Sequence, residues 1–315
     1  MNSLYLTIVQ IIIVMLLAPL SMGLVRMFKA RMQGRKGASP LLPYMTILTL
    51  LRKEMVISKS TSWVFRVVPF MVLGTTVFLI AVLPLLGAGG ILGPQSDFIV
   101  VAAVLALGAI FLVLGGLDTA SAFGGMGSSR EMTIASLLEP TVIVTFATFA
   151  LVSKSVTIDG MLAVGGQSIL THPALILSVI SLILIALAEN ARYPVDNPAT
   201  HLELTMVHEA MILEYSGPYL AMLEYASALK LTMFALLIAN VLFPVVLINA
   251  FGLVSVAALG AVVVLSVLKL IIAMFLLALL ESSIAKMRFF RMQEYLSIAF
   301  FIALSAFALV IITIV

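Results

Sequence analysis

The sequence has 315 residues, of which 63% are hydrophobic and 10% are charged, with a formal net charge of +3 and a mean hydropathy of +1.26. A soluble domain is about 45–50% apolar and about 25% charged, so this composition excludes a soluble protein and predicts an all-α, polytopic integral membrane protein. The absence of cysteine excludes disulfides and thiolate-held iron–sulfur clusters from this chain, and we expect neither a bound metal nor a nucleic-acid partner.

Eight apolar runs are long enough to cross a bilayer, which takes roughly 20 residues for about 30 Å of hydrocarbon. They lie at about 4–25, 66–88, 97–117, 131–152, 174–190, 219–248, 253–280 and 295–314. The first run is too long for the core of a signal peptide, so we expect it to be retained as a span. No repeat of fixed period and no long hydrophilic linker interrupts the runs, which predicts a single transmembrane domain over residues 1–315.

The loop between the first two spans is strongly basic. It carries nine of the 17 lysines and arginines, whereas Lys154 is the one basic residue in the even-numbered connections. The positive-inside rule therefore places the odd-numbered loops in the cytoplasm, and with eight spans both termini face outward. Nine basic residues exceed what orientation requires, so we interpret this loop as an amphipathic surface that also docks a partner or lipid headgroups.

The fifth connection is unusually rich in ionisable side chains. The stretch "YPVDNPATHLELTMVHEAMILEYSG" (193–217) contains Asp196, Glu203, Glu209, Glu214, His201 and His208. Ala199–Ser216 lacks proline and glycine, which predicts a second helix there, on which Glu203 and Glu214 would share one face. The two histidines are seven residues apart, rather than the four that bring ligands onto adjacent helical turns, so a metal site is disfavoured. A solvated surface helix with scattered charges is the alternative.

Further charges fall inside or at the ends of the predicted spans. Glu139 lies nine residues past Arg130 in the fourth span, which is about 13 Å at 1.5 Å per residue. The others are Glu189, Glu224, Lys230, Lys269 and Glu281. An ionisable group at membrane depth is costly unless it faces a partner or water. These residues therefore predict either a proton relay or buried ion pairs, in which Lys230 and Lys269 would each neutralise a carboxylate.

Four stretches together resemble the complex I subunit 1 family, which supplies an eight-helix membrane subunit. They are "QGRKGASPLLPYMTILTLLRKE" (33–54), "GLDTASAFGGMGSSRE" (116–131), "AENARYPVDNPATHLELTMVHEAMILEYSG" (188–217) and "LLESSIAKMRFFRMQEYL" (279–296). The second and third stretches are most similar to the branch found in formate hydrogenlyase, hydrogenase-4 and other membrane-bound group 4 nickel–iron hydrogenases.

The resemblance implies a membrane-anchor and proton-coupling subunit in the cytoplasmic (inner) membrane, joining a peripheral redox arm to a membrane arm. Its implied partners are the hydrogenase large and small subunits, an iron–sulfur subunit and an antiporter-like membrane subunit. The nickel–iron centre and iron–sulfur clusters would lie in those partners, with no redox centre and no catalytic residue in this chain. Carboxylates close together cannot all ionise, so a charge change in the redox arm would shift their protons.

The residues expected to act fall into two sets. The proton-coupling candidates are Glu139, Glu189, Asp196, Glu203, Glu209, Glu214, Glu224, Lys230, Lys269 and Glu281. The partner-docking candidates are Arg31, Arg35, Lys36, Arg130, Arg192 and Arg288.

Two other functions are compatible with parts of the sequence. Subunit 1 of a quinone-reducing complex I is one alternative, but the first loop has Ala38, Leu42, Thr46 and Thr49 where the family usually has proline, glutamine, aspartate and lysine, which disfavours quinone binding. A stand-alone secondary transporter is the other, and such proteins usually contain internal repeats.

Overall fold

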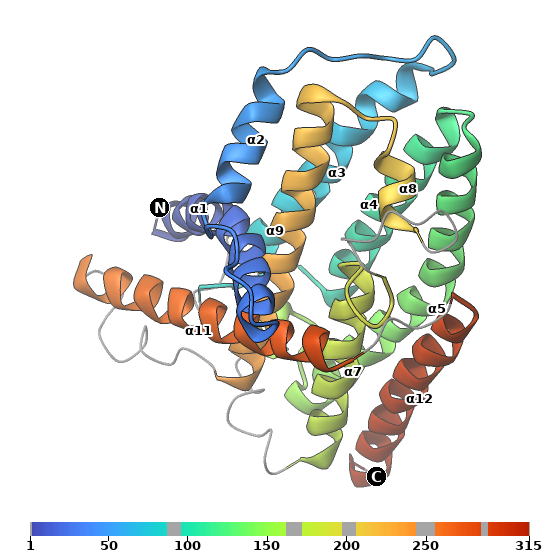
Figure 1. Ribbon diagram of the computed structural model, residues 1–315. Helices are drawn as coiled ribbons and strands as arrows, with labels where there is room; N and C mark the ends of the chain where they lie inside the picture. Colours follow the sequence, from blue (N-terminus) through green and yellow to red (C-terminus); the bar gives the residue numbers. More distant parts are fainter. Residues whose placement is uncertain are drawn as a thin grey trace.

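The computed structural model describes residues 2–86, 96–161, 172–196, 206–243, 256–284 and 289–314, and this part of the chain forms ten helices and no named strand (Figure 1). Seven of the helices are long and apolar enough to cross a membrane, and α7 is equally apolar but has 17 residues. The prediction of an all-α polytopic membrane protein is confirmed.

Each predicted span corresponds to one helix. In chain order these are α1 (Asn2–Met32), α3 (Trp63–Val82), α4 (Phe98–Asp118), α5 (Ala122–Ser153), α7 (Pro173–Glu189), α9 (Gly217–Leu242), α11 (Val256–Ser283) and α12 (Phe289–Ile314). Two short helices lie in the loops, namely α2 (Leu42–Arg52) and α8 (His208–Ile212).

The ends of the spans follow capping and proline rather than hydropathy. α3 ends at Val82, six residues before the apolar run does, because Pro84 holds Leu83 in an extended conformation. α5 begins at Ala122, nine residues before the run, because the Ser121 side chain accepts a hydrogen bond from the Gly124 amide at 3.1 Å. With 32 residues, α5 is about 48 Å long, so it must tilt or project beyond the roughly 30 Å hydrocarbon core.

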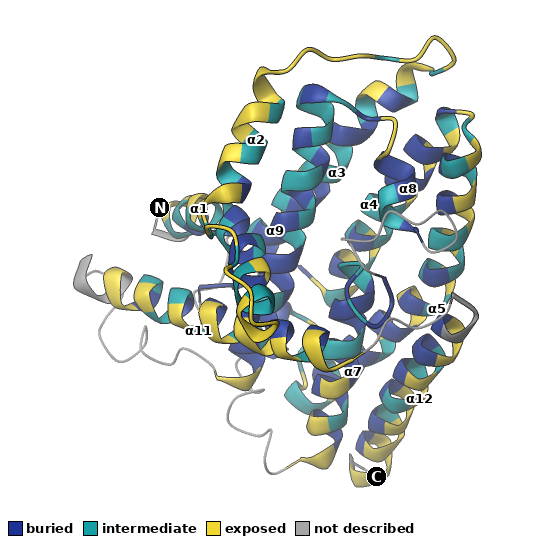
Figure 2. Ribbon diagram, viewed as in Figure 1, coloured by how far each residue is buried: buried dark blue, intermediate teal, exposed yellow. Residues whose placement is uncertain are grey.

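α9 lies at the centre of the molecule and is its most enclosed long helix, with 67% of its apolar window buried. It contacts α1, α2, α3, α7 and α11, and Figure 2 shows it dark blue along much of its length. Hydroxyl groups join the helices internally, as membrane bundles require where water is absent. Thr232 on α9 donates to Ser21 on α1 at 2.9 Å, and Thr145 on α5 lies 3.0 Å from Ser181 on α7.

The predicted amphipathic character of the first loop resides in α2. Pro43 is buried, and the helix packs against α1 and α9, while Met45 and Leu48 are more than half exposed. The Tyr44 hydroxyl donates to the Leu16 carbonyl of α1. An apolar face therefore remains open on α2 beside the basic residues of the same loop.

The helix predicted over Ala199–Ser216 is wrong both in its middle, where Met206 and Val207 are not helical, and at its carboxyl end. The described helix, α8, stops at Ile212, and residues 197–205, which include His201 and Glu203, lie outside the described residues. The helix ends there because Tyr215 is fixed by a tertiary contact: its ring stacks on Phe65 of α3, with ring centroids 3.9 Å apart. Glu214 is therefore exposed in a turn and cannot share a helix face with Glu203.

Ser216 joins the fifth connection to the first loop. Its hydroxyl accepts from the Val56 amide at 2.9 Å and donates to the Val56 carbonyl at 3.0 Å. The next residue, Gly217, has φ +54°, and a Cβ there would lie 2.8 Å from the Glu54 carbonyl oxygen. Glycine is the residue that tolerates both the left-handed backbone and this close approach.

Candidate functional site

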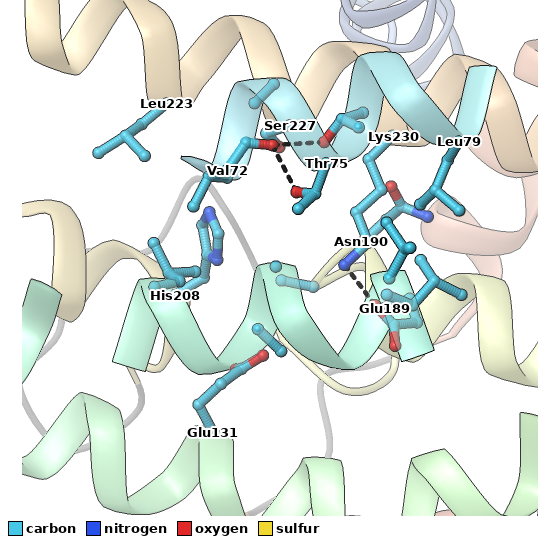
Figure 3. A pocket seen from close by; sticks show the side chains of 18 residues that line it. Val72, Thr75, Leu79, Glu131, Glu189, Asn190, His208, Leu223, Ser227 and Lys230 are labelled. Carbon is cyan, nitrogen blue, oxygen red and sulfur yellow. Dashed lines mark hydrogen bonds and ion pairs between the residues drawn. The ribbon is translucent and has the colours of Figure 1, made fainter. Parts of the chain in front are cut away.

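A small polar pocket lies among α3, α4, α5, α7, α8 and α9, at the end of the bundle that carries the fifth connection (Figure 3). Its volume is about 50 Å³, and since one water needs about 10–15 Å³ by this measure, it has room for roughly three to five waters. The polar side chains that line it are Thr75, Thr76, Glu131, Glu189, Asn190, His208, Ser227 and Lys230. The remaining lining is mainly aliphatic, so these few groups determine its chemistry.

Glu189 and Lys230 form an ion pair across the pocket. Glu189 is the last residue of α7, where a negative charge faces the unfavourable end of the helix dipole, and Lys230 reaches it from the middle of α9. Their side chains are 10% and 25% exposed. The pair agrees with the prediction that Lys230 neutralises a carboxylate.

Glu131 faces the same pocket from the third turn of α5, but within the described residues no cation lies within ion-pair distance of it. The charges that act on it come from Lys230, Glu189 and Asp196. Asp196 is itself buried, with 2% of its surface exposed. The electrostatic surroundings of Glu131 thus combine one ammonium group with two further carboxylates.

His208 completes the pocket at the start of α8. Burial, reinforced by the positive charge of Lys230, lowers the pKa of its imidazole to about 4. The ring is therefore neutral near pH 7, with one nitrogen that donates and one that accepts. Figure 3 shows His208 and Glu131 toward one end of the pocket, whereas Lys230 meets Glu189 at the other.

Gly127 explains how α8 comes so close to the bundle. A Cβ at this position of α5 would lie 2.9 Å from the Val207 carbonyl oxygen and 3.0 Å from the Ala210 side chain. Glycine therefore lets the backbone around His208 approach α5, one turn from Glu131. The glycine-rich stretch that opens α5 is in this way part of the site.

Asn190 has a buried acceptor with no partner among the residues that the structure describes. Its side-chain nitrogen donates to the Ala186 carbonyl at 2.7 Å, while the side-chain oxygen is buried and makes no hydrogen bond to the described residues. Buried amide oxygens are almost always hydrogen-bonded to protein or water. Because Asn190 lines the pocket, water there would satisfy it.

A second charged cluster lies next to the pocket along the chain. Glu281, 5% exposed at the end of α11, lies 2.8 Å from the Lys29 ammonium and 3.5 Å from the Arg192 guanidinium. Lys29 also lies over the Tyr193 ring, 4.9 Å from its centroid. Burial lowers the pKa of Arg192 and Glu281 opposes that effect. The end of α7 therefore carries Glu189 into the pocket, and the turn that follows carries Arg192 into this cluster.

The other predicted coupling residues are not gathered in the pocket. Glu139 is exposed on α5, Glu224 is half-buried on α9 with Arg26 as the charge that acts on it, and Glu209 is half-buried on α8. Lys269 hydrogen-bonds to the side-chain oxygen of Asn240 at 2.8 Å. The ion pair that was one of the two alternatives for Lys269 is not found among the described residues, which place no carboxylate within ion-pair distance of it.

The docking candidates occupy different environments. Arg31 is exposed in the last turn of α1, and Arg35 and Lys36 are exposed in the loop that follows. Arg130 donates to the Met206 carbonyl at 2.7 Å, which ties α5 to the fifth connection. Arg192 is buried against Glu281, and Arg288 lies outside the described residues.

Sequence reasoning missed Glu131 and the role of His208. Glu131 is the first residue of the predicted fourth span and directly follows Arg130, and no role was predicted for it from the sequence. Its position one turn from the glycine-rich segment was the available signal. His208 was considered only as a partner of His201.

Comparison with known proteins points in one direction. The model of the NADH dehydrogenase family matches residues 5–313. Hydrogenase-4 component C of Escherichia coli (strain K12) is 30% identical over 300 residues, covering 93% of this chain and 91% of that protein. Formate hydrogenlyase subunit 4 of the same organism is 27% identical over 289 residues, covering 91% and 92%.

The fold also matches a solved structure. A chain in the membrane-bound sulfane sulfur reductase, an archaeal respiratory membrane complex, superposes with a TM-score of 0.83 at 16% identity, over 98% of this chain and 100% of that one. At this identity the match establishes a shared fold.

Proposed function

The chain belongs to the NADH dehydrogenase family, and on this basis we propose that it is the membrane-arm subunit of a membrane-bound hydrogenase complex of the formate hydrogenlyase type, coupling electron transfer in a peripheral arm to proton movement. Its similarity to hydrogenase-4 component C and formate hydrogenlyase subunit 4 over more than nine-tenths of the chain supports the proposal. Nickel–iron and iron–sulfur centres would belong to partner subunits, and this chain would supply ionisable groups.

The observation that carries the mechanism is the convergence of Glu131, Glu189, His208 and Lys230 on one pocket with room for water. We propose that the carboxylates share an exchangeable proton and that Lys230 balances whichever of them is ionised. Neutral His208 can accept a proton at one nitrogen while donating at the other, so it connects the pocket to the fifth connection.

A charge change in a neighbouring subunit is large enough to move that proton. One electron about 10 Å away, at an effective dielectric constant of about 20, changes the energy of a unit charge by about 1.7 kcal/mol. This corresponds to roughly a tenfold change in proton affinity. Reduction of a nearby centre would therefore draw a proton into the pocket, and reoxidation would release it.

Two surface features suit the proposed partners. The exposed Arg31, Arg35 and Lys36 would dock the peripheral hydrogenase and iron–sulfur subunits. Glu139, exposed on a membrane-spanning helix, must be covered, because a carboxylate facing lipid is costly. We propose that the antiporter-like membrane subunit covers it, in the inner membrane, with both termini of this chain on the outer side.

The two alternatives have less support. A quinone-reducing complex I subunit shares the family, but the relatives reported above are hydrogenase and formate hydrogenlyase subunits. If this chain were a stand-alone transporter, we would not expect its fold to match a chain of a respiratory complex over nearly the whole length of both.

The test is Glu131→Gln in native membranes, with turnover and proton uptake normalised to assembled complex. The substitution keeps the shape but removes the titratable proton. Positioned proton transfer typically contributes about 10²–10⁴-fold, so we expect turnover to fall by about a hundredfold, with normal assembly. Glu294→Gln is the matched control, since Glu294 is an exposed carboxylate on α12 outside the pocket. Wild-type turnover in Glu131→Gln would refute the pocket's role.

A further inference from the structure

A second cavity, separate in character from the polar pocket, lies between α7, α9 and α11. It is a half-open groove of about 370 Å³. Its walls are almost entirely aliphatic and aromatic, as shown by Ile183, Leu187, Phe234, Ile238, Leu242 and Ile272. Lys269 is one of three charged or amide side chains that line it, with Asn190 and Arg192.

Lys269 is held in a defined position in this groove. Its ammonium donates to the Asn240 side-chain oxygen at 2.8 Å and to the main-chain carbonyl of Phe243 at the end of α9. Asn240 cannot turn away, because its own nitrogen donates to the Leu85 carbonyl at 2.6 Å and the Pro84 carbonyl at 3.3 Å. The lysine is thus placed by the fold rather than left to extend toward water.

No carboxylate among the described residues neutralises the charge of Lys269. Both of its acceptors are uncharged, and the described part of the chain places no carboxylate within 4 Å of it. An ammonium group has three donors, of which these contacts use two. A cation at membrane depth is stable when it meets an anion or a polar headgroup, so the groove presents a site for a negative group beside an apolar channel.

The length of the groove suits one lipid chain. Along α9 its lining runs from Leu231 to Phe243, which is about 18 Å at 1.5 Å per residue. Half of a roughly 30 Å hydrocarbon core is about 15 Å, so the groove is as long as one leaflet is deep. Lys269 meets Phe243 at the end of α9 that the loop charges place on the outer side.

We propose that this groove is a binding site for an anionic phospholipid, with its phosphate on Lys269 and one acyl chain along α9. The chain would cover the apolar walls, and the phosphate would take the third ammonium hydrogen and balance the charge. Asn190 lines both this groove and the polar pocket. A bound acyl chain would therefore also separate the small polar pocket from the bilayer at Asn190.

The test uses the intact complex, purified in mild detergent and exchanged into nanodiscs of phosphatidylcholine doped with phosphatidylglycerol. Native mass spectrometry then counts the phosphatidylglycerol retained. We expect one tightly held molecule in the wild type and about tenfold weaker retention in Lys269→Gln, since a charge-assisted hydrogen bond is lost. Lys154→Gln is the control, because Lys154 is exposed and lies outside the groove.

A second variant keeps Lys269 and fills the channel. Ala273→Phe places a ring where the acyl chain would lie, and we expect it to expel the phospholipid; this arm decides the matter if Lys269→Gln fails to assemble. Equal retention in wild type and both variants would overturn the proposal. So would a photo-crosslinker at position 273 that attaches to a neighbouring protein subunit, since a partner helix would then occupy the groove.

Discussion

Replacing Glu281 by glutamine should destabilise this protein more than most single changes, because two cations depend on one carboxylate. Glu281 is 5% exposed, with Lys29 at 2.8 Å and Arg192 at 3.5 Å. Removing one partner of a buried ion pair typically costs about 3–5 kcal/mol. Lys29 is 21% exposed and water will screen part of its charge, so we expect about 3 kcal/mol, mainly from the stranded Arg192.

The measurement is the thermal midpoint of the purified complex and the abundance of the subunit in membranes. At roughly 2 °C per kcal/mol for a chain of this size, the midpoint should fall by about 6 °C. The double variant Glu281→Gln/Arg192→Gln supplies the control, since removing the stranded guanidinium should recover part of the loss. If the double variant is less stable than Glu281→Gln alone, uncompensated charge is not the cause and the reasoning fails.

Four further results are expected. Reversing Arg31 and Arg35 to glutamate should release the peripheral subunits from an inserted membrane subunit, whereas Lys154→Glu should not; co-purification of an intact complex with both reversals would show that the loop is not the docking surface. Glu139→Gln should lower turnover per assembled complex at least tenfold if this exposed carboxylate passes protons to the neighbouring membrane subunit, and loss of that subunit at normal turnover would show an adhesive role instead. Glu224→Gln should likewise lower turnover with normal assembly. Since the pKa of His208 is lowered to about 4, the folded chain binds fewer protons there than the unfolded chain between about pH 6.5 and 4, so its contribution to stability falls as the pH drops through that range. His208→Gln should therefore reduce the dependence of the thermal midpoint on pH between pH 7 and 5. An unchanged pH dependence would contradict the lowered pKa.

The number and order of the helices could be predicted from the sequence, because hydrophobic length is a strong and local signal. The ends of the helices could not be predicted from hydropathy alone. α3 ends where Pro84 restricts Leu83, and α5 starts where Ser121 caps it, far outside the apolar run. α8 stops where the stacking of Tyr215 on Phe65 holds the chain, and that contact joins residues 150 positions apart.

The kinds of residue in the site could be predicted from the sequence, but which of them meet in the fold could not. An acid and a lysine at membrane depth predicted a pair, and Lys230 does meet Glu189. The partner of Lys269 was predicted to be a carboxylate, but the fold supplies an amide and a carbonyl, which carry no sequence signal. Glu131 joins the pocket because α5 extends as a helix through the glycine-rich segment, and a hydropathy window does not detect that extension.

The two hydrogen bonds between the Ser216 hydroxyl and the Val56 main chain couple the first loop to the fifth loop. The backbone at Gly217 has no slack there, since Glu54 leaves no room even for a methyl group. Gly217 is also the first residue of α9, and Lys230 follows 13 residues later on the same rigid helix, about 20 Å away. We therefore expect a displacement of the first loop to displace α9 as well. The ammonium group of Lys230 would then move relative to Glu189 without any loop having to refold.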